Sequence, residues 1–306
     1  MKILVVGVVK NHQVVRLKEE AQKRGHSLDA CIPSDLAIEA GTDNFMPVIR
    51  GKAAESYDLI YLWAVGKRRW EWYTACFYFN KNYKTIIVDH KVIDPGYRYY
   101  LSPAIDYLRQ TEHSLPYPKS AIVFSSRGLR ELLSGYDFPL IAKAPDRSQG
   151  KGVYKVENYS KLKQVVDELK SERKACIIRE FIPNDGDIRV FTVGYKAVGA
   201  MKRTPKEGDF RSNISQGGSG ARYDLESNPR VREIAEKASK ITRTEIAGVD
   251  IMVSKKDGKP YILEVNPGPQ FTGFEKYTGI NAAEEIIKYF ESLRKGGVSS
   301  NWLVIS

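Results

Sequence analysis

Residues 248–273 read GVDIMVSKKDGKPYILEVNPGPQFTG, and this stretch predicts more about the fold than any other part of the chain. Two short runs of β-favouring residues flank a Lys-Lys-Asp-Gly sequence that is typical of a hairpin turn. Because side chains alternate across a strand, Glu264 and Asn266 share one face of the second strand. A turn centred on Asp257 places Asp250 directly opposite Glu264.

Two carboxylates and an amide oxygen would then converge on one face of the hairpin. Such a set suits a hard cation such as Mg²⁺, shared with phosphate oxygens. The same sequence also suits an ordinary hairpin with a polar face. The hairpin by itself leaves both interpretations open.

The composition is that of an ordinary globular protein. The chain has 306 residues, 42% hydrophobic and 28% charged, enough for two or three packed subdomains. No apolar run approaches the roughly 20 residues of a membrane span, and the opening MKILVVGV indicates a buried strand rather than a signal peptide. Cys31, Cys76 and Cys176 are odd in number and lack metal-type spacing. We therefore expect a reduced, cytoplasmic protein with no membrane partner.

The charge balance favours acidic partners. The net charge is +11, from 48 basic and 37 acidic residues, and it is spread along the chain. One aromatic and basic patch stands out, KRRWEWY at 67–73, followed by FYF at 77–79. Aromatic rings between cations can stack nucleic-acid bases. A helix face packed between subdomains is the more common arrangement, and we expect no nucleic-acid partner.

The order of the predicted elements divides the chain into four parts. The first alternates apolar strands with a helix, which is the pattern of a small parallel sheet, and the later parts mix helices with more strands. The expected parts are an N-terminal α/β domain over 1–95, a central α+β unit over 96–178, a mainly β unit over 179–295 and a tail over 296–306.

A lysine at the end of an apolar strand precedes a glycine-rich segment. Lys143 ends the strand, and residues 148–153 read SQGKGV. The backbone N–H groups of such a loop can approach phosphates closely, and the lysine supplies a point charge. The spacing of a Walker loop is missing, and a flexible hairpin turn has the same composition.

Two further segments carry polar residues in positions that suit a nucleotide. Glu180 ends an apolar strand, where it can accept from an adenine edge or simply lie at a strand edge. Asp187 and Arg189 share a strand face, which suits either a salt bridge or a ribose and phosphate contact.

The loop at 202–218 is rich in cations, amides and glycine. Arg203, Lys206 and Arg211 can neutralise a triphosphate or a developing acyl phosphate, where preorganised charge lowers the barrier. A solvated surface loop is the alternative.

In this order the segments resemble the ATP-grasp superfamily, and within it the RimK type of glutamate ligase and its LysX-like relatives. The most specific parts of the resemblance are KEGDFRSN with the following glycines at 206–218 and the hairpin at 248–266. The resemblance covers about residues 100–292. It implies an ATP-grasp fold of the α/β (α+β) class, preceded by an N-terminal parallel-sheet domain.

The resemblance implies a role for each matching residue at the nucleotide. Lys143 would bind the ATP phosphates, and Glu180 and Phe181 would meet the adenine. Asp187 would contact the ribose. The other implied nucleotide-binding residues are Ser148, Gln149, Gly150 and Gly152 in the glycine loop, with Lys206 and Arg211.

The resemblance also implies where the chemistry takes place. Arg203, Arg211 and Asn213 would line the catalytic site, and two Mg²⁺ ions, or Mn²⁺ in their place, would be held by Asp250, Glu264 and Asn266. A carboxylate attacks ATP to give an acyl phosphate and ADP, and an amine then displaces phosphate to form an amide. No covalent nucleophile is required, in keeping with the lack of a catalytic Ser or Cys motif.

The substrates stay open at this point. The implied amine is an amino acid such as glutamate, but Pro267–Phe271 departs from the family's usual sequence. The carboxylate can belong to an acidic peptide, a carrier protein or a coenzyme. We expect that the chain forms a homo-oligomer, or that its apolar tail packs back on the body of the same chain.

A different class of function is a nucleotide- or nucleic-acid-binding module that keeps the fold without ligation. The patch at 67–79 motivates this alternative. The intact set of three oxygen-bearing side chains argues against it, because a pure binder gains little from them.

Overall fold

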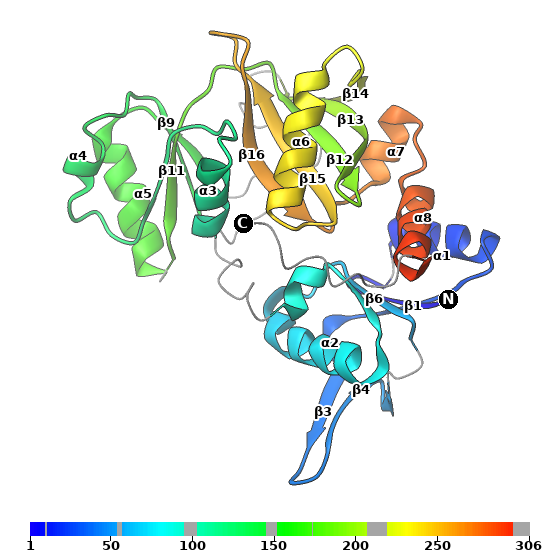
Figure 1. The fold of residues 1–306 in the computed structure, drawn as a ribbon. Helices are drawn as coiled ribbons and strands as arrows, with labels where there is room; N and C mark the ends of the chain where they lie inside the picture. The colour runs from blue at the N-terminus through cyan, green and yellow to red at the C-terminus, as the bar shows by residue number, and fades with distance from the viewer. Residues whose placement is uncertain are drawn as a thin grey trace.

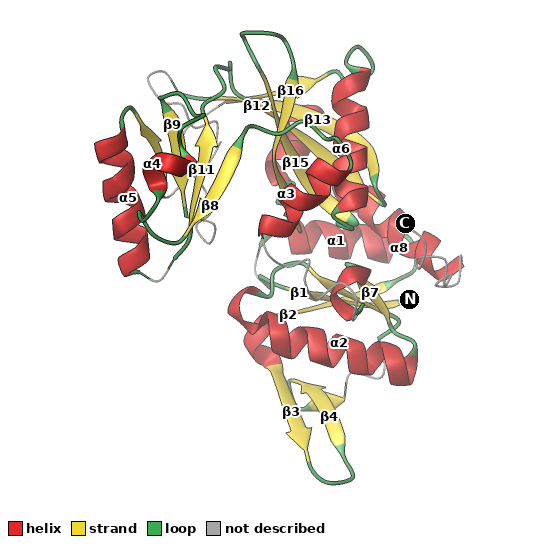
Figure 2. Ribbon diagram, turned by 60° about the vertical axis from the view of Figure 1, so that its left-hand side comes forward, coloured by secondary structure: helices red, strands yellow, loops and turns green. Residues whose placement is uncertain are grey.

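The structure is a computed structural model that describes residues 1–9, 11–53, 57–94, 103–144, 152–172, 174–206 and 219–295. Its strands form four sheets, covered by helices (Figures 1 and 2). The mixed α/β architecture expected from the sequence is therefore confirmed. Within the described residues, no helix is both long and apolar enough to cross a membrane.

The N-terminal sheet is parallel, as predicted from the alternation of strands and helix. Its order is β2–β1–β6–β7. The side chain of Asn11 caps α1 by accepting a hydrogen bond from the backbone N–H of Val14 at 2.9 Å. The elements of this layer are β1 (Lys2–Val6), α1 (His12–Lys23), β2 (Ser27–Cys31), β6 (Leu59–Leu62), α2 (Arg69–Tyr83) and β7 (Ile86–Val88).

A small antiparallel sheet projects from this layer, and the sequence did not lead us to expect it. It consists of β3 (Leu36–Ala40), β4 (Phe45–Ile49) and β5 (Lys52–Ala53). Figures 1 and 2 show it extending away from the rest of the protein. Most of β3 is exposed, so it lacks the hydrophobic alternation that marks a half-buried strand.

The central sheet is antiparallel, with the order β10–β9–β11–β8. Helix α5 packs on it through Leu162, Val165 and Leu169. The strand β11 lies wholly in this sheet and therefore crosses the expected boundary at residue 178. The elements are α3 (Pro103–Glu112), β8 (Ser120–Val123), α4 (Leu129–Leu132), β9 (Leu140–Lys143), β10 (Val153–Val156), α5 (Tyr159–Ser171) and β11 (Cys176–Glu180).

The C-terminal sheet has the order β14–β13–β12–β15–β16 and is antiparallel throughout. Two elements here were not expected from the sequence: the strand β14, which follows the loop at 202–218, and the short helix α7. The elements are β12 (Asp187–Val193), β13 (Lys196–Thr204), β14 (Ser219–Tyr223), α6 (Pro229–Ile241), β15 (Ile246–Val253), β16 (Pro260–Pro267), α7 (Thr272–Thr278) and α8 (Ala282–Lys295).

The β15–β16 hairpin has the register that the sequence predicted. Asp250 pairs with Glu264, and Gly248 pairs with Asn266. The turn is not centred on Asp257 as expected, because Val253 pairs with Pro260. The irregularity between Asp250 and Ile251 is what brings Asp250 opposite Glu264.

The N-terminal and C-terminal layers share one hydrophobic core. Helices α1 and α8 pack side by side (Figure 2), and Leu17 of α1 and Phe290 of α8 are buried in the same cluster. Arg24 and Glu291 form an ion pair across this contact at 2.7 Å. The N-terminal sheet is therefore held firmly against the C-terminal sheet, and the two together can frame a site.

Candidate functional site

Six polar side chains gather on one region of the C-terminal sheet, because the pairing of its strands brings their positions together. The register places Asp187 opposite Arg203, Arg189 opposite Asp250, and Asp250 opposite Glu264. Asn266 lies two residues beyond Glu264 on β16. These side chains were predicted in separate segments, and the sheet joins them.

Asp250 lies at the centre of this cluster. Its Oδ1 accepts from Arg189 Nε at 2.8 Å and lies 3.0 Å from Arg203 Nη2. Its Oδ2 accepts from Arg189 Nη2 at 2.7 Å and from Asn266 Nδ2 at 3.2 Å. Burial raises the pKa of this carboxyl, but Arg189 and Arg203 outweigh it and lower the pKa to about 2. Asp250 is therefore an anion in any ordinary buffer.

Asp187 and Arg203 form a second buried pair beside it. Arg203 donates from Nε to Oδ1 at 2.5 Å and from Nη2 to Oδ2 at 2.8 Å. The two residues are 6% and 4% exposed. Asp187 and Arg189 thus each form a salt bridge to a neighbouring strand, Asp187 with Arg203 and Arg189 with Asp250. A salt bridge was one of the two interpretations of their spacing in the sequence. Both expected roles, Asp187 at a ribose and Arg203 at an acyl phosphate, must compete with this pairing.

Lys143 connects the central sheet to the C-terminal sheet. It ends β9, and its Nζ lies 3.4 Å from Oε2 of Glu264 on β16. The Glu264 side chain is 53% exposed, so its carboxylate faces solvent between the two sheets. The lysine expected to bind phosphate and the carboxylate expected to bind a cation are thus in contact, although 121 residues separate them.

Glu180 and Phe181 lie where the chain passes from the central to the C-terminal sheet. The Glu180 backbone N–H donates to the Lys119 carbonyl at 3.0 Å. Lys155 of β10 lies over the Phe181 ring, 4.6 Å from its centroid. Both residues are partly exposed, so the connecting segment is accessible from the side of β10.

Several predicted residues lie outside the described part of the chain. They are Ser148, Gln149, Gly150, Arg211 and Asn213. Two of their neighbours are described: Gly152 has φ +69°, which suits a tight turn before β10, and Lys206 is exposed beyond the end of β13.

The oxygen set on β15 and β16 fits a hard cation in its chemistry. An ionised carboxylate has about four acceptor positions, and at Asp250 the contacts to Arg189, Arg203 and Asn266 use them. Glu264 is open, and the Asn266 amide is oriented because its nitrogen donates to Asp250 and to the Gly248 carbonyl. No three His, Cys, Asp or Glu side chains of the described residues group as a metal site. The side-chain oxygens open to a cation are therefore those of Glu264 and Asn266. Asp250 could bind the cation only after one of its present hydrogen bonds is broken.

The N-terminal layer holds the loop that follows these ligands, which the sequence analysis missed. The indole N–H of Trp63 donates to the Gly268 carbonyl at 2.6 Å, and the Phe271 N–H donates to Gln13 Oε1 at 2.7 Å. Gly268 has φ +57°, and a Cβ there would lie 2.3 Å from the Trp63 carbonyl oxygen. These contacts span more than 200 residues of sequence, so no local pattern signals them.

A cavity of about 370 Å³ lies between the N-terminal layer and β16. Its wall includes aromatic residues, cations and two carboxylates. Burial and the charge of Glu264 raise the pKa of Asp106 to about 6, although Lys91 opposes this. Lys91 itself donates to the Thr244 hydroxyl at 2.7 Å. The lining includes Trp63, Arg69, Tyr73, Lys91, Asp106 and Pro267.

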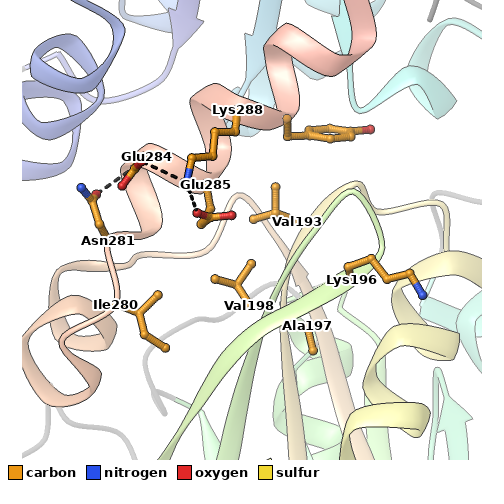
Figure 3. Close-up of a pocket in the computed structure, with 10 residues that line it drawn as sticks. Val193, Lys196, Ala197, Val198, Ile280, Asn281, Glu284, Glu285 and Lys288 are labelled. Atoms are coloured by element: carbon orange, nitrogen blue, oxygen red, sulfur yellow. Dashed lines mark hydrogen bonds and ion pairs between the residues drawn. The ribbon is translucent and has the colours of Figure 1, made fainter. Parts of the chain in front are cut away.

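A second cavity, of about 470 Å³, lies beside the β12–β13 turn and α8 (Figure 3). Its charged residues already have partners: Lys288 lies 2.9 Å from Glu284 and 2.8 Å from Glu285. Lys196 lies 3.1 Å from Glu236. The first cavity, which borders β16, is therefore the better candidate for a substrate.

The sequence matches the family model described as "RimK-like ATP-grasp domain" over residues 105–290. A "Probable alpha-L-glutamate ligase" of Legionella pneumophila (strain Corby) is 38% identical over 165 residues, which is 53% of each chain. The chain thus spans about half the length of that relative. Another protein of the same name, from Halorhodospira halophila, is 30% identical over 291 residues and 92% of each chain.

Solved structures share the fold across nearly the whole chain. The ATP-grasp ligase PsnB, complexed with a precursor variant, Mg and ADP, has a TM-score of 0.71 and 15% identity, covering 95% of this chain and 98% of its own. The D-cycloserine synthetase DcsG has a TM-score of 0.69 and 12% identity, covering 95% and 99%. The expected ATP-grasp fold is therefore confirmed, including the N-terminal parallel sheet.

Proposed function

Because the chain belongs to the RimK-like ATP-grasp family, we propose that it is an ATP-dependent carboxylate–amine ligase. The reaction converts a substrate carboxylate to an acyl phosphate with release of ADP. An amine then attacks the acyl carbon, the amide forms, and phosphate leaves. The relatives that carry the name alpha-L-glutamate ligase support this class of reaction.

The contact between Lys143 and Glu264 carries the proposal. The Lys143 ammonium and the Glu264 carboxylate come from two different sheets and lie 3.4 Å apart. The Glu264 side chain is 53% exposed, so a ligand can reach it. Each is a ligand for one part of Mg-ATP, the lysine for phosphate and the carboxylate for the cation. A salt bridge with no ligand to hold would not require this partly open arrangement.

The division of labour among the residues follows from their contacts. We assign Lys143 to the phosphates, Glu180 and Phe181 to the adenine, and Glu264 with Asn266 to the cation. Asp250 joins the cation when phosphate oxygens compete for its arginines. Mg²⁺ held there would neutralise charge on the phosphates as the acyl phosphate forms.

Arg203 has a double role in this proposal. Its Nε and Nη2 hold Asp187 and Asp250 in place, and its remaining donors can face the transferring phosphoryl group. Asp187 then acts mainly by orienting Arg203. Lys206, Arg211 and Asn213 complete the site as the resemblance implies, together with Ser148, Gln149, Gly150 and Gly152.

The substrates are proposed as an amino acid amine, such as glutamate, and a carboxylate on a peptide, carrier or coenzyme. One structural neighbour is in complex with a precursor peptide and another with a leader and core peptide, which supports a peptide substrate. We also propose two Mg²⁺ ions, with Mn²⁺ as a substitute, a cytoplasmic location and a homo-oligomer. The division at residues 95, 178 and 295 remains a proposal, with the second boundary better placed after β11.

The test is ADP release from the purified protein with Mg-ATP, measured against panels of carboxylates and amino acids. We expect ADP to depend on one carboxylate–amine pair. Formation of AMP, or a rate of ADP formation that no carboxylate and no amino acid changes, would contradict the proposal.

A further inference from the structure

Most of the aromatic and basic patch at 67–79 lies outside the ligase site described above, although Arg69 and Tyr73 line its cavity. Its residues lie in α2 and in the short 3-10 helix before it, Gly66–Arg68. Lys67, Arg68 and Arg69 are all exposed, and none forms an ion pair with a carboxylate of the described residues. Arg69 donates from Nε to the Gly66 carbonyl at 3.3 Å. The buried half of this helix, Trp72, Ala75, Cys76 and Phe79, packs in the core of the N-terminal layer itself.

The exposed half of α2 forms a stripe along the helix. Trp70, Thr74, Phe77 and Lys81 follow each other at spacings of four and three residues, so they share one face. Trp70 is 57% exposed and Phe77 is 46% exposed. Large aromatic side chains open to water beside unpaired cations are typical of a binding surface rather than of a neutral surface.

This stripe is continuous with the cavity at β16. Arg69 and Tyr73 line the cavity, and they lie on the helix face next to the stripe. The Trp70 ring meets the Tyr73 ring edge to face, with centroids 5.9 Å apart. A chain lying along the stripe would therefore reach the mouth of the cavity without leaving the protein surface.

We propose that this face of α2 docks an acidic polypeptide segment of the substrate, whose reacting end enters the cavity at β16. The proposal rests on the proposed ligase function. Acidic side chains would pair with Lys67 and Arg68, and apolar side chains would cover Trp70 and Phe77. The net charge of +11 favours the same kind of partner.

The proposed reaction argues for a polypeptide rather than a nucleic acid. A polypeptide offers the carboxyl or amino group that amide formation consumes. Two aromatic side chains one helical repeat of seven residues apart also suit spaced apolar side chains better than a continuous stack of bases.

The test is the binding of a fluorescein-labelled oligoglutamate peptide, followed by fluorescence anisotropy in low salt. We expect Arg68→Glu and Trp70→Ala each to weaken binding by about tenfold, because exposed Trp and Arg dominate such surfaces. Lys18→Glu makes the same charge change as Arg68→Glu on an exposed position of α1, and we expect it to change binding by less than about twofold. Circular dichroism melting confirms that each variant folds.

Three results would overturn the docking surface. One is equal binding by Arg68→Glu, Trp70→Ala and Lys18→Glu, and another is tighter binding of polyuridylate RNA than of oligoglutamate. The third is a parent protein that binds Mg-ATP but no oligoglutamate, which removes the docking surface alone. A parent that binds neither removes the ligase assignment together with it.

Discussion

Lys143 at the end of β9 and Glu264 in β16 meet at 3.4 Å, and they join two sheets that share no strand. Neither side chain is deeply buried, with exposures of 20% and 53%. An ion pair of this kind contributes little to stability. Its position between the central and C-terminal sheets is better explained by a ligand that binds both residues.

Glu264→Ala should therefore remove catalysis while leaving the fold unchanged. We expect ADP formation to fall by at least about a hundredfold, since a preorganised charge at the phosphates is lost. The measurement is ADP release at saturating Mg-ATP, with melting temperature as the check on folding. Glu233→Ala, at an exposed position of α6, is the matched control and should retain turnover. Full turnover in Glu264→Ala would remove the cation assignment.

Lys143→Met tests the other partner. We expect a higher KM for ATP with a change in unfolding free energy below about 1 kcal/mol, because the pair is solvent-exposed. Steady-state kinetics and urea denaturation separate the two effects. A large loss of stability with an unchanged KM would mean that the pair is structural.

Arg203→Met should have the opposite signature. It leaves the buried Asp187 without its arginine and removes one of the two arginines that contact Asp250. We expect a loss of about 3–5 kcal/mol in the free energy of unfolding. The exposed Arg230–Glu233 pair provides the control: Arg230→Met should cost less than about 1 kcal/mol. Urea denaturation measures the unfolding free energy of both variants. Equal losses would show that the buried Asp187–Arg203–Asp250 network stabilises the fold no more than an exposed ion pair does.

The fold and the site were predictable from the sequence to different degrees. The pairing of Asp250 with Glu264 was predicted correctly, but the predicted turn was wrong. Val253 pairs with Pro260, so the turn is not centred on Asp257, and an irregularity between Asp250 and Ile251 brings Asp250 opposite Glu264. The parallel N-terminal sheet followed from the alternation of strands and helix. The exposed strand β3 was not predictable, because nothing buries one of its faces.

The partners of the site residues could not be read from the sequence. The fork between Arg203 and Asp187 depends on the pairing of β12 with β13, and the bond from Trp63 to Gly268 joins positions 205 residues apart. Residues on one strand face can bind a ligand or each other, and only the three-dimensional arrangement decides between these. The predicted roles of Asp187 and Arg203 thus changed once their mutual hydrogen bonds were known.

Trp63→Phe tests whether the N-terminal layer positions the loop after the cation ligands. The variant keeps the ring and removes the N–H that donates to the Gly268 carbonyl. We expect the Mg²⁺ concentration for half-maximal activity to rise about tenfold, as for other residues that orient metal ligands. Trp72→Phe is the control, because it removes an indole N–H that donates to the Pro33 carbonyl, away from this loop. An unchanged Mg²⁺ requirement in Trp63→Phe would restrict its role to packing.

Stability should fall as the pH rises from about 4.5 toward 8. Burial, and then the nearby Asp89 carboxylate, raise the pKa of Glu245 from 4.5 to about 8. The native state therefore holds a proton that the unfolded chain has released, and it loses stability across that interval. Asp89 accepts from the Glu245 N–H at 2.7 Å, and Glu245 Oε1 accepts from the His90 N–H at 3.3 Å, so this carboxyl pair joins the two layers.

Glu245→Gln should flatten most of this pH dependence, leaving a smaller slope from Asp89, whose pKa burial also raises. The measurement is urea denaturation at a series of pH values. Parallel curves for the parent and Glu245→Gln would show that Glu245 does not titrate in this interval.

The most direct test of the ligase assignment uses a carboxylate substrate labelled with ¹⁸O. Once the paired substrates are known, phosphorus NMR of the reaction mixture shows which product carries the label. An acyl phosphate mechanism transfers one labelled oxygen to inorganic phosphate, with ADP as the nucleotide product. Label in AMP, or unlabelled phosphate accompanying the amide, would contradict it.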